Sequence, residues 1–485
     1  MLLLNLLLLL VIQYAAGNGL LHLFKIKLSM VKQIALSFIC GVLLVSIVPF
    51  VISLMKIPIT FGSVTAGMVA VVVLMNVWRL KNVKSFSFKD LGLRFPSIRL
   101  YDVPFVLVLL VCFVSSGWRS FYLPSNARDM LSGPEVLAEY AVKEKTILNS
   151  VFTVNLESTN NHLKPPYILD LQIIYKLYGF YFGQWWVAVI SISFMLFLYQ
   201  LLREKIHPVI AGTLMLFFVA APEMYAYSYM MLFDYSNMAL FFLGIYFLYS
   251  YFKSGVKREF YFSALLFGFA TFIRLETLIL IGMFVPLFWF YAFKNKLGVK
   301  NTVLQTAAMV GISFIFYFSW INIFLPYYMP GKFNLDDQRN HNLANLDPLF
   351  TRFGEMNTKL LNGPWELALW GYIVKLFLVV TIGELVAIRK LSRESVNWLY
   401  ACAVVYFGLP LLGYLLPLMD LMNTTKRALF KLMPLIVMVM ANNGLLQRLS
   451  RAMFNWENAV PKEVKAVTPQ RKAPVKQQNP KPAKR

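Results

Sequence analysis

Runs of apolar residues separated by short polar stretches extend along almost the whole chain. A helix that crosses a bilayer needs roughly 20 mostly apolar residues, because each adds about 1.5 Å toward a hydrocarbon core of about 30 Å. By this criterion we predict about thirteen spans, several of them short. Their ranges are 2–14, 34–55, 65–78, 103–118, 184–202, 208–221, 236–252, 260–273, 277–293, 303–325, 367–388, 397–418 and 428–446. The sequence therefore predicts an all-α fold, a polytopic bundle of transmembrane helices.

The composition supports this fold class. Of the 485 residues, 59% are hydrophobic and only 14% are charged, which is more apolar surface than a water-soluble globule can bury. The formal net charge of +23 would suggest a nucleic-acid partner in a soluble protein. Here the basic residues fall in loops beside the spans, so membrane lipids are the expected partners and nucleic acid is not. Cys40, Cys112 and Cys402 lie within apolar runs, which argues against a disulfide framework.

Lysine and arginine gather in alternate loops, and such loops are held on the cytoplasmic side of a membrane. This basic set is Lys25, Lys27, Lys32, Arg79, Lys81, Lys84, Lys89, Arg94, Arg99, Arg203, Lys205, Lys253, Lys257, Arg258, Lys294, Lys296, Lys300, Arg389, Lys390 and Arg393. The first apolar run lacks the basic region of a signal peptide, so we expect it to remain as a span. The pattern predicts an N-terminus outside and a C-terminus in the cytoplasm.

The predicted spans and loops divide the chain into three parts. Residues 1–100 hold three spans and a basic cytoplasmic loop, and residues 101–446 hold the remaining spans with two long outer loops, 119–183 and 326–366. Residues 447–485 are rich in Lys, Pro and Gln, which predicts a disordered basic cytoplasmic tail. Such a tail either binds anionic lipid headgroups or stays solvated without a partner.

The first outer loop has a pattern of its own. Residues 130–148 place apolar side chains on one helical face, which predicts a juxtamembrane helix lying along the membrane surface. That face holds Gly133, Leu137, Tyr140, Ala141 and Leu148. The polar segment 125–129, which contains Arg128 and Asp129, precedes this helix, and the segment Asn160-Asn161-His162-Leu163-Lys164-Pro165-Pro166-Tyr167 follows it. Charged groups are thus predicted at the lipid boundary.

Three features together resemble the membrane-embedded glycosyltransferases of the GT-C superfamily, in particular the dolichyl-phosphate-mannose-protein mannosyltransferase-like branch that includes the aminoarabinose transferases. An outward-running span ends in a loop with an early acid, Asp129; Lys164-Pro165-Pro166-Tyr167 is similar to a signature that re-enters the membrane; and residues 425–434 are similar to a late basic-then-Leu-Pro pattern. Two features depart from the family. Asp129 is followed by Met130 where the family often has a second acid, and three spans precede the core.

The resemblance implies an inverting glycosyltransferase of a bacterial plasma membrane, which moves a sugar from a polyprenyl-phosphate donor to an outward-facing lipid, glycan or protein acceptor. The acceptor hydroxyl must lose a proton as it attacks the anomeric carbon, so a carboxylate is needed as general base, and Asp129 is the candidate. The departing lipid phosphate gains negative charge, which fixed cations stabilise. The candidate cations are Lys164, Arg274, Lys426 and Arg427.

Other candidates for substrate binding are Arg128, His162, Tyr167, Glu223 and Asp234. Glu223 and Asp234 bracket a short outer turn, where each is a second acid, a metal ligand, or a solvated or capping side chain. No histidine spacing suits zinc, whereas Mg²⁺ or Mn²⁺ held by carboxylates and lipid phosphate stays open. Arg274 lies where two apolar runs meet, and it is either part of a functional pair with Glu276 or the polar tip of a tight turn.

Aromatic residues also mark the outer boundary. Trp185, Trp186, Tyr225, Tyr227 and Tyr229 are either membrane-interface anchors or stacking surfaces for sugar rings. The second long loop, 326–366, has apolar residues at helical spacing after a polar stretch, which is typical of a lid and of an ordinary flexible loop alike.

Two other classes of function stay open. A flippase that moves a lipid-linked sugar usually has inverted repeats with broken helices at mid-membrane, and no clear repeat is seen in this sequence. An O-antigen ligase or polymerase usually has its large loop late in the chain, whereas the larger loop comes early here.

Overall fold

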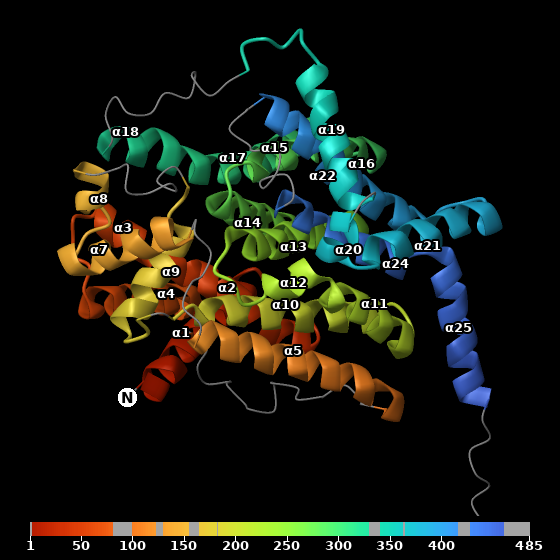
Figure 1. Ribbon diagram of the computed structural model, residues 1–485, viewed down its shortest axis with the longest axis horizontal. Coiled ribbons are helices and arrows are strands. Elements are labelled where there is room, and N and C mark those ends of the chain that lie inside the picture. Colours follow the sequence, from red (N-terminus) through yellow and green to blue (C-terminus); the bar gives the residue numbers. More distant parts are fainter. Residues whose placement is uncertain are drawn as a thin grey trace, which may run out of the picture.

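The computed structural model describes residues 2–80, 99–122, 130–154, 164–181, 183–328, 340–361, 364–415 and 427–459, and these ranges contain helices and no strand (Figure 1). The first half comprises α1 (Leu2–Leu23), α2 (Met30–Ser46), α3 (Val48–Leu54), α4 (Phe61–Leu80), η3 (Leu100–Asp102), α5 (Val103–Tyr122), η4 (Leu131–Glu135), α7 (Val136–Glu144), α8 (Ser150–Thr153), α9 (Tyr167–Leu177), α10 (Trp185–Arg203), α11 (Pro208–Ala220) and α12 (Pro222–Ala226). The second half comprises α13 (Phe233–Ser254), α14 (Lys257–Ile273), α15 (Thr277–Gly282), α16 (Val285–Lys294), α17 (Val299–Phe318), η6 (Ser319–Phe324), α18 (Leu325–Tyr328), α19 (Asp347–Leu360), α20 (Pro364–Trp370), α21 (Ile373–Ile388), α22 (Arg393–Leu415), η8 (Leu429–Lys431), α24 (Leu432–Ala441) and α25 (Gly444–Ala459).

Eight helical segments among the described residues are long and apolar enough to cross a membrane, or nine if the bent pair of η8–α24 and α25 counts as one. They are Leu2–Leu23, Met30–Leu54, Phe61–Trp78, Leu100–Tyr122, Trp185–Arg203, Thr277–Lys294, Val299–Phe324 and Arg393–Leu415. The all-α transmembrane fold class is therefore confirmed. The other predicted ranges also form helices, but α11, α13, α14 and α21 are shorter or less apolar than these eight segments, so thirteen spans stay a prediction.

The N-terminal helices pack closely through glycine. A methyl group on Gly17 would lie 1.8 Å from the backbone oxygen of Ser37, and one on Gly41 would lie 1.7 Å from that of Gln13, so the backbones of α1 and α2 touch at both positions. Only glycine permits such an approach. The two closely packed helices form a surface against which α9 and α10 pack.

Helix α9, which follows the Lys164-Pro165-Pro166 segment, is held in place by this N-terminal unit. The Asn5 amide donates to the carbonyl oxygen of Tyr178 (2.8 Å), and Thr65 is hydrogen-bonded to the Tyr178 hydroxyl (2.8 Å). The Gln13 amide donates to the Tyr175 hydroxyl (3.3 Å). With 11 residues α9 is too short to cross a bilayer. Helices α1 and α4, which belong to the N-terminal part that the resemblance leaves unexplained, thus support the segment that follows the family-like motif.

Helices α13 and α14 form an antiparallel hairpin. Gly255 ends α13 with φ +68°, a left-handed conformation that glycine adopts without strain. The Ser263 hydroxyl donates to the Gly244 carbonyl (2.6 Å), and a methyl group on Gly244 would meet the Phe267 ring at 2.6 Å. This hairpin geometry places the first residues of α13 beside the last residues of α14.

Two predicted segments differ from the structure, and a third agrees with it. The surface helix predicted over 130–148 ends at Glu144, because Lys145 adopts a left-handed conformation (φ 59°) and its carbonyl accepts from Ile59 N–H (2.7 Å). Disorder predicted from residue 447 is wrong for residues 447–459, which belong to α25; residues 460–485 lie outside the described ranges. The helical spacing within 349–360 is confirmed by α19, which packs on α22.

Candidate functional site

An ion-pair cluster forms where α13 begins and α14 ends. Asp234 lies in the first turn of α13, where a negative charge is favoured by the helix dipole, and Arg274 follows the last residue of α14, where a positive charge is favoured. The Arg274 guanidinium pairs with one carboxylate oxygen of Asp234. Its Nε lies 2.6 Å from Oε1 of Glu276. The Asp234 side chain is completely buried, so its charge depends on these partners.

Arg427 and Lys431 join the cluster from the last part of the chain. Arg427 Nε donates to the second Asp234 oxygen (2.9 Å), which links residues 193 positions apart. The buried Lys431 side chain lies on η8, which packs on α13, and its Nζ is 3.8 Å from Glu276 Oε1. Three basic groups thus face two carboxylates, Asp234 and Glu276, and positive charge is in excess. We call these five residues the Asp234 cluster.

A buried amide fixes the backbone beneath the Asp234 cluster. Asn237, one turn after Asp234, donates from Nδ2 to the Ala270 carbonyl (2.7 Å) and to the Thr277 hydroxyl (2.9 Å). The same carbonyl accepts from the Arg274 N–H (3.0 Å). Because Asn237 ties α13 to both sides of the α14–α15 turn, the position of Arg274 is set by the hairpin rather than by a mobile loop.

Lys164 lies beside the Asp234 cluster. Its ammonium is 5.2 Å from the centre of the Phe233 ring, and Phe233 directly precedes Asp234. Lys164, Pro165, Pro166 and Phe233 line a pocket together with one residue from each of five helical elements, η4, α7, α8, α9 and η6. Those residues are Pro134, Leu137, Phe152, Leu169 and Trp320. The family-like motif, the surface helix α7 and the start of α13 therefore meet at one pocket.

Aromatic rings border the Asp234 cluster on another side. The Tyr227 ring lies 4.2 Å, centre to centre, from Phe430, and Phe430 lies 5.2 Å from Trp370. Burial first, and then the negative charges of Asp234 and Glu223, raise the pKa of the Tyr227 hydroxyl, which stays protonated. The Tyr227 hydroxyl is thus available as a hydrogen-bond donor near the charged groups.

Arg119 is a residue that the sequence reading missed. Near the end of α5, its Nη1 donates to the Tyr229 hydroxyl (2.6 Å), and its guanidinium lies 4.6 Å from the Tyr229 ring centre and 5.8 Å from that of Tyr225. No carboxylate pairs with it among the described residues. The Tyr225–Tyr229 segment therefore presents Tyr227 toward the Asp234 cluster and Tyr225 and Tyr229 toward Arg119. Sequence spacing gave no signal for this contact, since 110 residues separate its members.

The predicted site residues are distributed as follows. Lys164, Arg274, Arg427 and Asp234 come together at the start of α13, and Glu223 lies nearby on α12, half-buried. Asp234 is not solvated: its oxygens are held by two guanidinium groups. Tyr167 is fully buried in the core, with its ring 5.7 Å from Trp186, so it faces protein rather than an open site. Arg128, Asp129, His162 and Lys426 lie outside the described residues.

Metal binding finds no support in the part of the chain that the structure describes, where no three His, Cys, Asp or Glu side chains gather closely enough to hold an ion. The two acids of the Asp234 cluster, the buried Asp234 and the partly exposed Glu276, have basic partners instead.

Comparison of the chain with family models, with curated proteins and with solved structures finds no match.

Proposed function

We propose that this protein is a membrane glycosyltransferase of GT-C type, which transfers a sugar from a polyprenyl phosphate to an outward-facing lipid, glycan or protein. The observation that carries the proposal is the convergence of Lys164, Arg274 and Arg427, from three distant parts of the chain, around Phe233 and Asp234. These are three of the four cations that the resemblance assigns to the donor phosphate.

The gathering of Arg274, Arg427 and Lys431 in the Asp234 cluster, with Lys164 beside it, supports a phosphate ligand. Two unit charges 4 Å apart attract by about 4 kcal/mol at an effective dielectric constant of 20, against about 1 kcal/mol in bulk water. A lipid phosphate near partly buried arginines is therefore stabilised more than a solvated one. A second attraction arises as the bond between the sugar and the phosphate breaks, because the phosphate leaves with the electron pair.

Asp234 acts in this proposal as a positioning residue. Each of its oxygens holds one guanidinium, so the two arginines are fixed in orientation without a substrate. Because both oxygens are engaged and the side chain is buried, Asp234 is poorly placed to take a proton from an acceptor. The general base is assigned to Asp129, which would remove the acceptor hydroxyl proton as its oxygen attacks the anomeric carbon.

The membrane arrangement belongs to the same proposal. Thirteen crossings, with the Asp234 cluster at the outer leaflet of a bacterial plasma membrane, would let a lipid-linked donor reach the cluster by lateral diffusion. The alternating distribution of Lys and Arg supports this orientation.

Purified protein in lipid nanodiscs tests the proposal with a radiolabelled polyprenyl-phosphate sugar and a short-chain polyprenyl phosphate. Lys164→Ala and Arg427→Ala should each weaken binding of the phosphate about tenfold to a hundredfold, the range for a charge-assisted hydrogen bond. Asp129→Asn should abolish sugar transfer and leave that binding intact.

Lys143→Ala is the matched control, because Lys143 is an exposed lysine of the neighbouring α7 whose partner is Glu139. Its binding should equal that of the wild type. Full transfer by Asp129→Asn would remove Asp129 as the base, and unchanged phosphate binding in both Lys164→Ala and Arg427→Ala would reject the donor site.

A further inference from the structure

Helix α25 leaves the bundle at a bend that is built from buried polar groups. The axis turns by 56° between the η8–α24 segment and α25. Glu384 of α21 is buried at this point, where its carboxylate accepts from the Gly444 N–H (2.8 Å) and from the Asn443 amide (2.6 Å). The carboxylate satisfies the backbone N–H of the first residue of α25, where a negative charge is favoured. The bend is therefore a fixed feature of the fold.

One face of α25 binds the rest of the protein. The Ser450 hydroxyl accepts from the His207 N–H at the start of α11 (2.8 Å), and the Phe454 ring lies 4.7 Å from that of His207. Glu457 pairs with Arg99 and accepts from the Tyr101 hydroxyl (3.0 Å), just before α5. These contacts seat α25 across the ends of α11 and α5, as Figure 1 shows.

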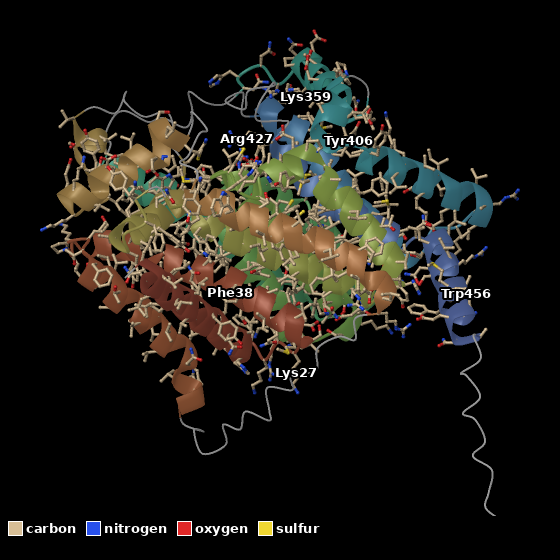
Figure 2. The ribbon with its side chains drawn as sticks, turned by 60° about the horizontal axis from the view of Figure 1, so that its bottom comes forward. Lys27, Phe38, Lys359, Tyr406, Arg427 and Trp456 are labelled. Atoms are coloured by element: carbon tan, nitrogen blue, oxygen red, sulfur yellow. The ribbon has the colours of Figure 1, made fainter. Side chains whose placement is uncertain are left out.

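A different face of α25 is apolar and exposed. Leu449 and Trp456, seven residues apart and so aligned on a helix, are 50% and 75% exposed. Ala452 lies between them on the same face and is also exposed. Trp456 is seen at the margin of the molecule, away from Arg427 (Figure 2). This surface, Leu449, Ala452 and Trp456, is the apolar face of α25.

Basic side chains border that face. Arg448 and Arg451 on α25, and Arg389 and Lys390 just after α21, are exposed, and none of the four pairs with an acid among the described residues. Helix α25 also carries polar residues along its length, including Asn455, Glu457 and Asn458, so it is too polar to lie in the hydrocarbon core. An exposed apolar stripe beside unpaired arginines suits the boundary between anionic headgroups and acyl chains.

We propose that α25 lies in the headgroup region of the leaflet at this end of the bundle, with Leu449 and Trp456 inserted among acyl chains and with Arg448 and Arg451 bound to anionic lipid. The ligand is the surface of an anionic membrane. The site lies at the opposite end of α5 from Arg119 and does not depend on the proposed enzymatic activity.

Spin labels on the full-length protein test this proposal. Leu449→Cys, Trp456→Cys and Asn458→Cys are each made in a chain whose three native cysteines are replaced by alanine, and each protein is reconstituted in nanodiscs of neutral lipid with or without 30% phosphatidylglycerol. Asn458 is the matched control, since it is exposed on the same helix but off the apolar face. Collisions of the label with oxygen report contact with acyl chains, and collisions with a water-soluble nickel chelate report contact with water.

Labels at 449 and 456 should favour oxygen at least severalfold more than the label at 458, and phosphatidylglycerol should increase the difference. Arg448→Gln combined with Arg451→Gln should remove that increase while leaving the difference in neutral lipid. Equal nickel access at all three positions would overturn the proposal and would indicate an aqueous or protein-facing surface. A difference that is identical in neutral and anionic nanodiscs would overturn the assignment of anionic lipid.

Discussion

Asp234 is the residue on which the arrangement of the candidate site depends most. Two guanidinium groups from different parts of the chain share one buried carboxylate, and neither arginine is positioned by the other. Removing one partner of a buried ion pair leaves the remaining charge without compensation, which usually costs more than the pair itself contributes. The consequence is larger here because two guanidinium groups lose the same partner, while Glu276 still pairs with Arg274.

Replacing Asp234 with asparagine should therefore lower the free energy of unfolding by about 3–5 kcal/mol, since the two arginines lose their shared counter-charge. Thermal unfolding of the purified protein in detergent measures this loss as a decrease in Tm. Asp347→Asn serves as the control: Asp347 also lies in the first turn of a helix, α19, but it is exposed. Equal Tm changes for the two variants would mean that Asp234 does not hold the arginines together.

Some of this site could be predicted at the level of single residues, and some could not. Asp234 and Arg274 end two apolar runs that are joined by a short basic link, so an antiparallel hairpin brings them together from sequence alone. Arg427 reaches the same carboxylate only through the packing of η8 on α13, which no local pattern encodes. The family-like motif identified Lys164, but Arg119 belongs to no motif and becomes visible only when α5 packs beside the Tyr225–Tyr229 segment.

At the scale of single helices, His207 lies at the junction of α11 with α25, where it caps the start of α11 and can also take up a proton. His207 Nδ1 accepts from the Val209 N–H (3.3 Å) at the start of α11, so this nitrogen must carry no proton. His207 Nε2 lies 3.6 Å from Glu457 of α25, and Arg99, Tyr101 and Asp102 surround the ring. Protonation of the ring removes the cap and adds a buried charge near Arg99.

Burial and then the charge of Arg99 lower the pKa of His207, although Asp102 opposes the shift. The unfolded chain then binds the proton more readily, with a pKa near the ordinary 6.5. The stabilising contribution of neutral His207 is complete above that pH and is lost as the pH falls below it toward the folded value.

Thermal unfolding between pH 7.5 and pH 5 should show this loss in the wild type and a weaker one in His207→Gln. His341→Gln is the control, because His341 is exposed. The Tm of this variant should change with pH as the Tm of the wild type does. An unchanged pH profile in His207→Gln would contradict the assignment.

Helical elements were largely predictable because each run of apolar residues is long, whereas their ends were not. The surface helix ends four residues before its predicted limit, at the left-handed Lys145, which is held through its carbonyl by Ile59 of a distant segment. Residues 447–459 of α25 are predicted to be disordered because the segment 447–485 is rich in Lys, Pro and Gln. This helix is stabilised by one face, which contacts residues at the ends of α5 and α11. The average composition of a segment does not show how its residues are distributed between the faces of a helix.

At the scale of the whole molecule, the N-terminal helices α1 to α4 and the family-like core form one packed unit. Hydrogen bonds from Asn5, Gln13 and Thr65 reach the residues of α9 and the turn after it. The pocket beside Lys164 is therefore supported from behind by helices that the resemblance does not include. Removing the N-terminal unit would expose α9, a short helix with most of its side chains buried.

The number of crossings can be decided by the sidedness of two exposed positions, Lys257 and Thr351. If α14 crosses the membrane, as thirteen spans require, three crossings separate these residues and they lie on opposite sides. If only the eight long apolar segments cross, two crossings separate them, Thr277–Lys294 and Val299–Phe324, and they lie on the same side. We expect opposite sides, because the link that holds Lys253, Lys257 and Arg258 carries the positive charge of a cytoplasmic loop.

In intact bacterial cells, a membrane-impermeant maleimide should label Thr351→Cys at once and Lys257→Cys only after permeabilisation, both in a chain without its three native cysteines. If both positions are labelled before permeabilisation, or if both are labelled only after it, thirteen crossings are rejected. If Lys257→Cys is labelled at once and Thr351→Cys only after permeabilisation, the orientation is inverted. The Asp234 cluster would then lie at the cytoplasmic leaflet, where the proposed outer-leaflet donor could not reach it.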